Sequence, residues 1–151
     1  MYKRQLQISI AAFNERFQKK QIVVTQQLPT RAGSFGDPDR LSQLFNNLLE
    51  NSLRYTDSGG TLRIHASNDN GHCVIVWEDS APGVDEEQLS HIFDRFYRAE
   101  RSRNRASGGS GLGLAICKNI VEAHGGELYA KPSPLGGVQM TVVLVLQPLE
   151  S

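Results

Sequence analysis

Apolar side chains recur at helical spacing in three stretches of the sequence, residues 2–20, 37–56 and 111–124. Each residue of an α-helix lies about 100° around the axis from the one before it, so this spacing gathers apolar side chains on one face. The faces consist of Leu6, Ile10, Phe13 and Phe17 in the first stretch, Leu41, Leu44, Phe45 and Leu48 with Ser52 in the second, and Leu112, Ile116, Ile120 and Ala123 in the third. The pattern predicts three amphipathic helices around one core.

Strand patterns lie between and after these helical stretches. Runs rich in β-branched or alternating apolar residues occupy residues 21–28, 61–67, 72–78, 127–131 and 138–146. The turn sequence NDNG joins the second run to the third, and SPLGG joins the fourth to the fifth, so both pairs are expected to be antiparallel. Elements in this mixed order favour an α+β fold, a two-layer α/β sandwich with helices on one sheet face, over a doubly wound parallel sheet.

Regular patterning is lost from Asp79 to Ser110, apart from a short helical piece near residues 85–96. A connection of this length inside a compact domain is usually functional or disordered. We therefore expect residues 84–110 to form a lid beside a binding site.

Composition narrows the class of protein. A length of 151 residues suits a single domain that buries roughly 68–70% of its unfolded surface. Lysine plus arginine equals aspartate plus glutamate at 16 each, so no overall positive field points to nucleic acid. No apolar run approaches the roughly 18 residues that span a bilayer, so we expect a soluble fragment. Cys73 and Cys117 lie in apolar runs without a zinc pattern, which predicts buried thiols in a reducing compartment.

One edge of the second predicted helix carries candidate chemistry. Asn47, Asn51 and Arg54 line up beside its apolar face, with Tyr55 near the boundary. Amide oxygens suit a hard cation, a guanidinium suits phosphate, and an aromatic ring can stack on a base. The edge therefore favours a site for a metal and a nucleotide, with a solvated helix flank as the alternative.

Asp79 follows the run VIVWE and opens the segment DSAPG. A carboxylate at a strand end can accept a hydrogen bond from an exocyclic amino group such as that of adenine, a contact worth about 1.5–3 kcal/mol. The alternative is an Asx-type turn residue before Pro-Gly. Asp79 is therefore a candidate for base recognition.

Four glycines precede the third predicted helix in the segment SGGSGLGLA, at positions 108, 109, 111 and 113. Such glycines let backbone N–H groups approach an anion at the positive end of the helix dipole. The spacing fits neither a Walker loop nor GxGxxG, so it indicates another kind of phosphate cradle, with a flexible hinge as the alternative. Upstream, five arginines against two acidic residues leave a local charge of about +3, which can face phosphate, an acidic partner or water.

Four segments together resemble the catalytic domain of two-component sensor histidine kinases. They are similar in content and order to its N box, first glycine box, F box and second glycine box, and here read NLLENSLRYT at 47–56, DSAPG at 79–83, FDRFYR at 93–98 and GGSGLGLA at 108–115. The similarity continues through EAHGG at 122–126 and the closing strand at 136–141, so it covers nearly the whole chain. The phrases LFNNLLENSLRYTDSGG and RNRASGGSGLGLAI resemble the envelope-stress branch of this family.

This resemblance implies the Bergerat fold of the GHKL proteins, a mixed sheet of about five strands backed by three helices on one face, with an ATP lid. It also implies ATP and Mg²⁺ as cofactors. On this reading Asn51 holds Mg²⁺, and Asn47 supports the metal or its waters. Arg54 meets phosphate, Tyr55 lies along the base, and Asp79 receives the adenine amino group.

Further nucleotide contacts are implied for the lid and the glycine segment, namely Gly83, Arg98, Arg103, Gly109, Gly111, Leu112 and Gly113. Gly83 leaves room for the ring, the glycines wrap the triphosphate, and the two arginines reach the phosphates from the lid. The implied catalytic residues are Asn47 and Arg98. The chain departs from the usual D-x-G-x-G at Ala81, a variant that the loop tolerates if φ is negative there.

The implied activity is transfer of the γ-phosphoryl group to a histidine of a dimerisation domain, with relay to a response regulator. No histidine of this chain lies in an H-E-x-x-P-like context, so we expect that domain to be absent from these residues. The chain begins inside an amphipathic pattern, as expected for the cytoplasmic catalytic domain of a longer, inner-membrane kinase.

The alternatives are a GHKL-type ATPase, a nucleotide-binding or interaction module without activity, and a serine kinase of the same fold. In the hydrolytic relatives a glutamate at the position of Asn47 activates water. An amide cannot take up that proton, so Asn47 counts against the ATPase.

Overall fold

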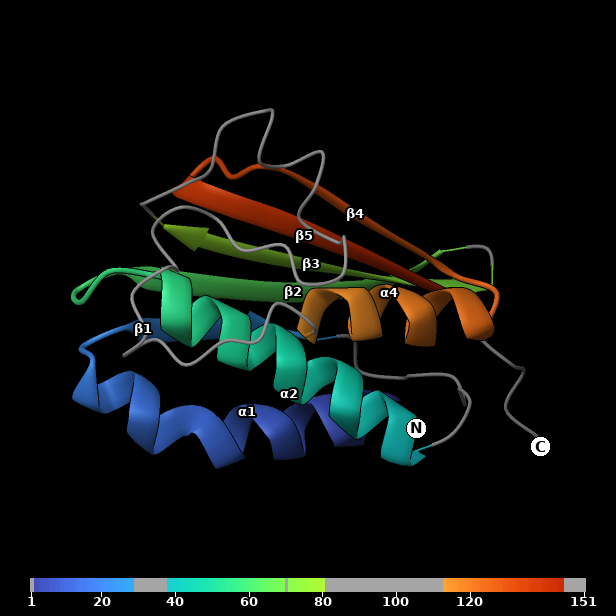
Figure 1. Cartoon of the computed structure of the whole chain (residues 1–151), viewed down its shortest axis with the longest axis horizontal. Helices are drawn as coiled ribbons and strands as arrows, with labels where there is room; N and C mark the ends of the chain where they lie inside the picture. The colour runs from blue at the N-terminus through green and yellow to red at the C-terminus, as the bar shows by residue number, and fades with distance from the viewer. Residues whose placement is uncertain (1, 29–37, 70, 81–112, 146–151) are drawn as a thin grey trace.

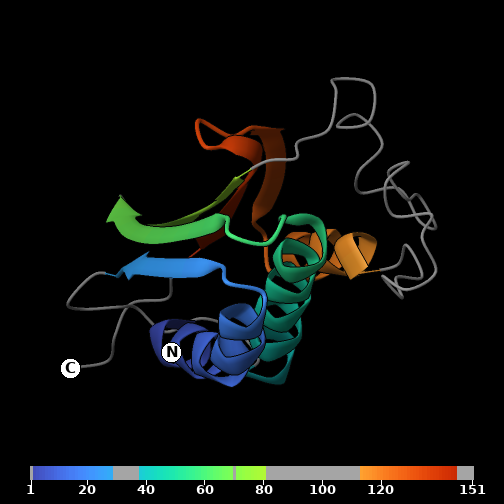
Figure 2. The same ribbon diagram turned by 90° about the vertical axis from the view of Figure 1, so that its left-hand side faces the viewer.

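The computed structural model describes residues 2–28, 38–69, 71–80 and 113–145. The helices in these ranges are α1 (Tyr2–Lys19), α2 (Pro38–Tyr55) and α4 (Gly113–Ala123). The strands are β1 (Val23–Gln27), β2 (Thr61–Asp69), β3 (His72–Ser80), β4 (Glu127–Pro132) and β5 (Gly136–Val145). The helices lie together on one side of the sheet (Figure 1, Figure 2). The predicted two-layer α+β sandwich is confirmed.

The strands form one five-stranded mixed sheet in the order β1-β2-β3-β5-β4. β1 runs parallel to β2, whereas the other neighbouring pairs are antiparallel, as predicted for the two hairpins. β3 extends two residues beyond the predicted run, so Asp79 lies inside the sheet and not in a loop after it. The register between β3 and β5 shifts between Glu78 and Ser80. The end of β3 is therefore flanked by β2 and β5 and lies beneath the helix layer.

The apolar faces predicted for α1 and α2 are buried, with no side chain in them more than 7% exposed. The face predicted for α4 is partly wrong, because Ile116 is only half-buried and Ala123 is exposed, whereas Cys117 and Val121 are fully buried. α4 packs on both α2 and β4, which makes its buried face wide. Residues four apart also lie about 40° apart around the helix axis, so a face predicted from a four-residue spacing turns away from the buried face along the helix. No helix in the described ranges is long and apolar enough to cross a membrane.

Phe45 of α2 and Trp77 of β3 join the helix layer to the sheet. Their ring planes are 16° apart and their centroids 6.4 Å apart. Both side chains are at most 1% exposed. Aromatic side chains bury roughly 150–250 Å² each, so this pair is a large part of the core. The contact holds α2 over β3 and so places the polar edge of the helix beside the end of the strand.

Lys20 stabilises the end of α2 that carries predicted site residues. Its Nζ donates hydrogen bonds to the backbone carbonyl oxygens of Leu53 at 2.6 Å and Arg54 at 3.4 Å. A cation there satisfies carbonyl groups that have no partner within the helix and complements the helix dipole. Burial lowers the pKa of Lys20, and the Asp57 carboxylate acts in the opposite direction.

Candidate nucleotide-binding site

The polar edge of α2 carries the first group of predicted site residues. Asn47 and Asn51 are both half-buried, and positions four apart lie on the same side of a helix. The Arg54 side chain is 20% exposed. α2 ends at Tyr55, whose side chain lies outside the described part of the structure. The two amides and the guanidinium therefore share one edge, as predicted.

Arg54 forms an ion pair that was not predicted from the sequence. Its Nη2 lies 3.5 Å from Oε1 of Glu50, and the other oxygen of that carboxylate lies 2.9 Å from Nη2 of Arg16 on α1. The Glu50–Arg54 spacing of four residues was a visible signal for the pair. Partly exposed ion pairs of this kind are worth about 0–1 kcal/mol. A polyphosphate could therefore recruit Arg54 from Glu50 at small cost.

Asn47 of α2 lies near Cys117 of α4, close enough to lower the pKa of its thiol. The thiol donates a hydrogen bond to the backbone carbonyl of Leu44, with 3.7 Å between Sγ and O. Burial raises the pKa of Cys117 to about 12, against smaller effects in the opposite direction. The thiol is therefore protonated at neutral pH. An amide of the candidate site therefore lies beside the helix that begins at Gly113, the last glycine of the predicted cradle.

Asp79 is buried at the end of β3, with 6% of its surface exposed. The backbone N–H of Val138 on β5 donates to its Oδ1 at 2.8 Å. Burial raises the pKa of Asp79 to about 6, and the Val138 N–H and the nearby Ser52 side chain on α2 act in the opposite direction. The residue that the sequence singled out for base recognition is thus buried but still mainly ionised at neutral pH.

Gly137 is required beside Asp79. A Cβ atom built on Gly137 would collide with Oδ1 of Asp79 and with the backbone carbonyl oxygens of Asp79 and Ser80. Backbone atoms cannot move aside as the end of a flexible side chain can. The close approach of β5 that brings the Val138 N–H to the carboxylate therefore needs a glycine at this position.

The donor set of the site fits an adenine nucleotide with Mg²⁺. A carboxylate has about four lone-pair positions, so the hydrogen bond from Val138 to Asp79 leaves capacity for an exocyclic amino group. The described residues contain no cluster of three or more His, Cys, Asp or Glu that could hold a metal. Mg²⁺ commonly binds through one or two protein oxygens plus substrate phosphates and water. The amide oxygens of Asn47 and Asn51 fit that mode.

Several predicted contacts lie outside the described residues, namely Gly83, Arg98, Arg103, Gly109, Gly111 and Leu112, as does the predicted lid at 84–110. The structure thus brings together the part of the candidate site formed by α2, the end of β3 and the start of α4. Ser52, Cys117 and Gly137 belong to this part and were not predicted as functional. Ser52 was placed on an apolar helix face, and only the tertiary structure shows that it lies near Asp79.

A second polar group surrounds Glu78 on the sheet face away from the helices. Arg63 Nε donates a hydrogen bond to Oε1 of Glu78 at 2.9 Å, and its Nη2 lies 2.9 Å from the same oxygen in an ion pair. His65 lies 3.3 Å from the same oxygen, and Gln139 donates to Oε2 at 3.0 Å. The Glu78 side chain is only 3% exposed. This group, which we call the Glu78 cluster, did not emerge from the sequence.

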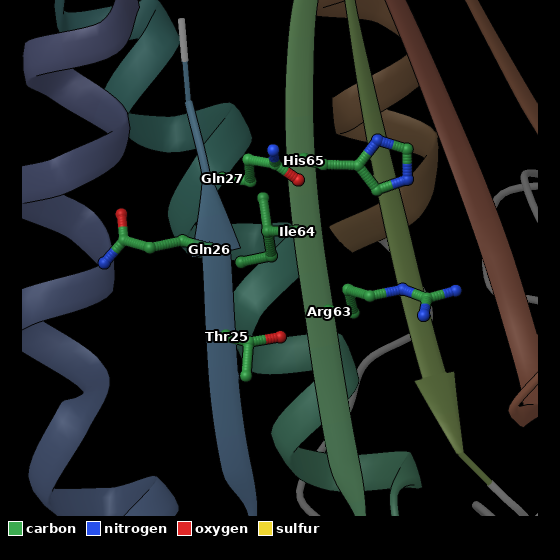
Figure 3. Close-up of a pocket in the computed structure, with 6 residues that line it drawn as sticks. All are labelled: Thr25, Gln26, Gln27, Arg63, Ile64 and His65. Carbon is green, nitrogen blue, oxygen red and sulfur yellow. The ribbon is translucent and has the colours of Figure 1, made fainter.

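A pocket of about 500 Å³ lies beside the Glu78 cluster, between β1 and β2. It is lined by Thr25, Gln26, Gln27, Arg63, Ile64 and His65. Arg63 and His65 extend over β3, whereas Gln26 points toward α1 (Figure 3). None of the residues predicted to bind nucleotide lines this pocket, so it is separate from the candidate site.

Residues 36–148 match the family of histidine kinase-, DNA gyrase B- and HSP90-like ATPases. The chain belongs to that family. Its ATPase character supports ATP as the nucleotide. A particular relative is the signal transduction histidine-protein kinase BaeS of Escherichia coli K12, which is 58% identical over 94% of this chain and 30% of the relative. The sensor histidine kinase YkoH of Bacillus subtilis is 40% identical over 70% of this chain and 23% of the relative. The chain thus spans less than a third of these relatives.

Solved structures agree with the fold. The mycobacterial sensor histidine kinase MprB superimposes with a TM-score of 0.80 and 26% identity, over 97% of this chain and 95% of that one. A nucleotide-free catalytic domain of the histidine kinase ThkA gives a TM-score of 0.83 at 23% identity, over 97% and 95% of the two chains. The fold is that of histidine kinase catalytic domains, as the sequence motifs implied.

Proposed function

We propose that this chain is the catalytic domain of a two-component sensor histidine kinase. It binds Mg–ATP and transfers the γ-phosphoryl group to a histidine of the dimerisation domain of the same kinase. The observation that carries the proposal is the buried, mainly ionised Asp79 beside the amide edge of α2, in a chain that belongs to this ATPase family. The 58% identity to BaeS supports the kinase branch of the family.

The described residues act by holding the nucleotide in place. Asp79 accepts a hydrogen bond from the adenine amino group, which selects the base. Asn51 and Asn47 would hold Mg²⁺ through their amide oxygens, and the ion would supply positive charge to neutralise the phosphates. Arg54 is near enough to this edge to exchange Glu50 for a phosphate. Rate acceleration then comes from positioning and charge neutralisation, the main sources of catalysis in phosphoryl transfer.

The side chain of Asn47 is an amide, which favours transfer of the phosphoryl group to another protein group over hydrolysis of ATP. Its amide lies near the protonated Cys117 thiol, and neither group can remove a proton from water at neutral pH. Activated water is therefore not supplied by this pair. The attacking group in the proposed reaction is a histidine nitrogen brought by another domain.

The finer parts of the proposal concern domain limits, lid and partners. In this proposal residues 1–151 form a single catalytic domain with the lid at 84–110. Gly83 leaves room for the adenine ring, and Arg98 and Arg103 reach the phosphates from the lid. The phosphohistidine passes its group to a response regulator. The kinase ThkA has been solved in complex with the response regulator protein TrrA, which supports this kind of partner. The whole kinase lies in the bacterial inner membrane with this domain on the cytoplasmic side.

The test is a phosphotransfer assay with a separately produced dimerisation domain of BaeS, the relative at 58% identity. With Mg²⁺ and labelled ATP, the wild-type chain should form an acid-labile, base-stable phosphohistidine on that domain. Asn51→Ala should abolish both the product and Mg²⁺-dependent ATP binding while the fold survives, as judged by circular dichroism. Glu122→Gln, at an exposed position on α4, is the matched control.

Three outcomes would contradict the proposal. Release of inorganic phosphate without any phosphohistidine would indicate a GHKL-type ATPase. Mg²⁺-dependent ATP binding with neither product would indicate a nucleotide-binding module without activity. Acid-stable phosphoserine on a partner would move the assignment to a serine kinase.

A further inference from the structure

Three charged residues connect the end of α1 to the end of α2. Nη2 of Arg16 donates a hydrogen bond to Oε2 of Glu50 at 2.9 Å, whereas Oε1 of Glu50 lies 3.5 Å from Nη2 of Arg54. The side chains of Arg16 and Glu50 are 50% and 39% exposed, and that of Arg54 is 20% exposed. One carboxylate is thus shared between two cations, and it lies closer to the cation on α1.

Arg16 has a second contact, with a ring on its own helix. The guanidinium carbon of Arg16 lies 4.3 Å from the centroid of the Phe13 ring, and Phe13 is buried in the core. The face of an aromatic ring attracts a cation, so the ring and the Glu50 carboxylate hold the guanidinium together. Arg16 therefore holds the carboxylate from a fixed position on α1.

Arg54 has two neighbours on α2, and they differ in charge. Side chains of a helix lean toward its N-terminus, so Arg54 extends over the positions three and four residues earlier. These positions hold Asn51, which we propose to bind Mg²⁺ with the phosphates, and Glu50. The contact of Arg54 with Glu50 is longer than that of Arg16 with the same carboxylate. Arg54 is therefore the cation that a phosphate removes more easily from Glu50.

Phosphate binding at Arg54 then depends on where the Glu50 carboxylate stays. A carboxylate beside Arg54 competes with phosphate for the guanidinium, and two negative groups at close range repel each other. Arg16 opposes both effects, because it holds Oε2 of Glu50 and partly neutralises its charge. Without Arg16, the carboxylate would pair more firmly with Arg54.

We propose that Arg16 is a positioning residue for phosphate binding, which retains the Glu50 carboxylate on the α1 side and so releases Arg54 to the phosphates of the nucleotide. This inference rests on the proposed nucleotide site and deepens it. Glu50 is then an internal competitor of phosphate, and Arg16 acts through Glu50 without touching the nucleotide.

The experiment compares ADP with adenosine, which lacks the phosphates, by isothermal titration in Mg²⁺ buffer of low ionic strength, where exposed charges are little screened. Arg16→Gln should weaken ADP binding about threefold, and Glu50→Gln should strengthen it about threefold, which are effects of the size of an exposed ion pair. Adenosine should bind each variant within about 1.5-fold of the wild type. Equal changes for adenosine and ADP would overturn the proposal, because they would show a general disturbance of the site.

Glu15 and Lys19 supply matched controls on α1. They form an exposed ion pair with the same four-residue spacing and the same distance of 3.5 Å as Glu50 and Arg54. Glu15→Gln removes one negative charge, as Glu50→Gln does. Lys19→Gln removes one positive charge, as Arg16→Gln does. Both controls should bind ADP within about 1.5-fold of the wild type, and changes of about threefold would contradict the proposal by showing an effect of net charge alone.

A double-mutant cycle tests whether Arg16 acts through Glu50. Once Glu50→Gln has removed the carboxylate, Arg16→Gln should change ADP affinity by less than about 1.5-fold. The same threefold loss with and without the Glu50 carboxylate would mean that Arg16 acts directly on the phosphates, and the positioning role would be wrong.

Arg54→Gln separates this inference from the proposed function. In the proposed site this variant should weaken the binding of ADP and leave that of adenosine unchanged. An Arg54→Gln variant that binds ADP like the wild type would overturn the phosphate contact in the proposed site, and the inference with it. If Arg54→Gln weakens ADP binding but Arg16→Gln does not, only the positioning role of Arg16 fails.

Discussion

Glu78 and Asp79 are neighbouring buried carboxylates on β3 with opposite surroundings. Glu78 pairs across the sheet with Arg63 and Gln139, on the face away from the helices, and its carboxylate forms a hydrogen bond and an ion pair with the Arg63 guanidinium. Asp79 pairs with buried Leu62 on the helix side. Its carboxylate accepts a backbone N–H, and no cation among the described residues pairs with it.

The difference separates a structural carboxylate from one available to a ligand. A buried charge is tolerated when a cation and further hydrogen bonds surround it, as at Glu78. At Asp79 no such compensation is present in the described part of the chain, and burial dominates its pKa. Residues with perturbed pKa values concentrate at functional sites, and a carboxylate with remaining acceptor capacity can serve an incoming donor. Two adjacent acidic residues in the sequence therefore have different roles because the strand alternates between faces.

The largest effect on stability is expected from Glu78→Gln. The change removes a charge-assisted hydrogen bond worth about 1.5–3 kcal/mol, while the half-exposed Arg63 guanidinium that remains keeps its contact with water. Urea unfolding followed by circular dichroism should show this loss, while nucleotide affinity stays within about twofold of wild type. Glu122→Gln on the exposed side of α4 is the control. A stable Glu78→Gln variant with lost nucleotide binding would reverse the roles we assign to the two residues.

Asp79→Asn should have the opposite profile. The side chain keeps its size and an oxygen for Val138, but an amide can no longer offer an ionised acceptor to the adenine amino group. We expect about a 100-fold loss of affinity for a non-hydrolysable ATP analogue, the upper part of the range for a charge-assisted hydrogen bond. Calorimetric titration measures this loss. Stability at neutral pH should not fall, and a destabilisation as large as that of Glu78→Gln would make Asp79 a structural residue.

The pH dependence of stability gives the next effect. The folded-state pKa of Asp79 is raised from 3.8 to about 6, so the native state binds its proton more tightly than the unfolded state. Stability should therefore fall as pH rises between these two values and not change further above them. Relative to Asp79→Asn, the wild type should lose on the order of 2–3 kcal/mol across this window. Urea titrations of both proteins at several pH values measure the difference, and parallel pH profiles would be inconsistent with a buried, cation-free Asp79.

The smallest effect is expected from His65→Ala. His65 contacts the same oxygen of Glu78 as Arg63, but its side chain is 42% exposed. Exposed partners contribute about 0.2–1 kcal/mol, so this variant should lose less than a third of what Glu78→Gln loses. Parallel unfolding of the two variants tests the order. A loss as large as that of Glu78→Gln would show that the imidazole, and not the guanidinium, stabilises the buried carboxylate.

Local sequence patterns predicted much of the fold. The spacing of Leu41, Leu44, Phe45 and Leu48 placed the core face of α2 correctly, and the two turn sequences gave the antiparallel strand pairs. The apolar run before Asp79 also indicated that this carboxylate lies at the end of a strand. The α4 face was rotated because that helix contacts two elements, and the sequence does not show how much of each it meets.

The missing parts depend on long-range register. The polar edge of α2 lies beside the end of β3 because Phe45 packs on Trp77 and brings the helix over the strand. Val138 donates to Asp79 only because Gly137 allows β5 to come close. The cross-strand neighbours of Glu78 likewise follow from the pairing of β3 with β2 and β5. Such contacts join residues far apart in the chain, and local periodicity carries no information about them.

Nucleotide recognition by Asp79 and the α2 amides is tested by isothermal titration of this chain with a non-hydrolysable ATP analogue, with and without Mg²⁺, and with the matching GTP analogue as control. A base recognised by Asp79 and phosphates held with Mg²⁺ by the α2 amides predict binding that requires Mg²⁺ and prefers adenine. Equal affinity for the two analogues, or no binding of the ATP analogue at millimolar concentration, would contradict the account.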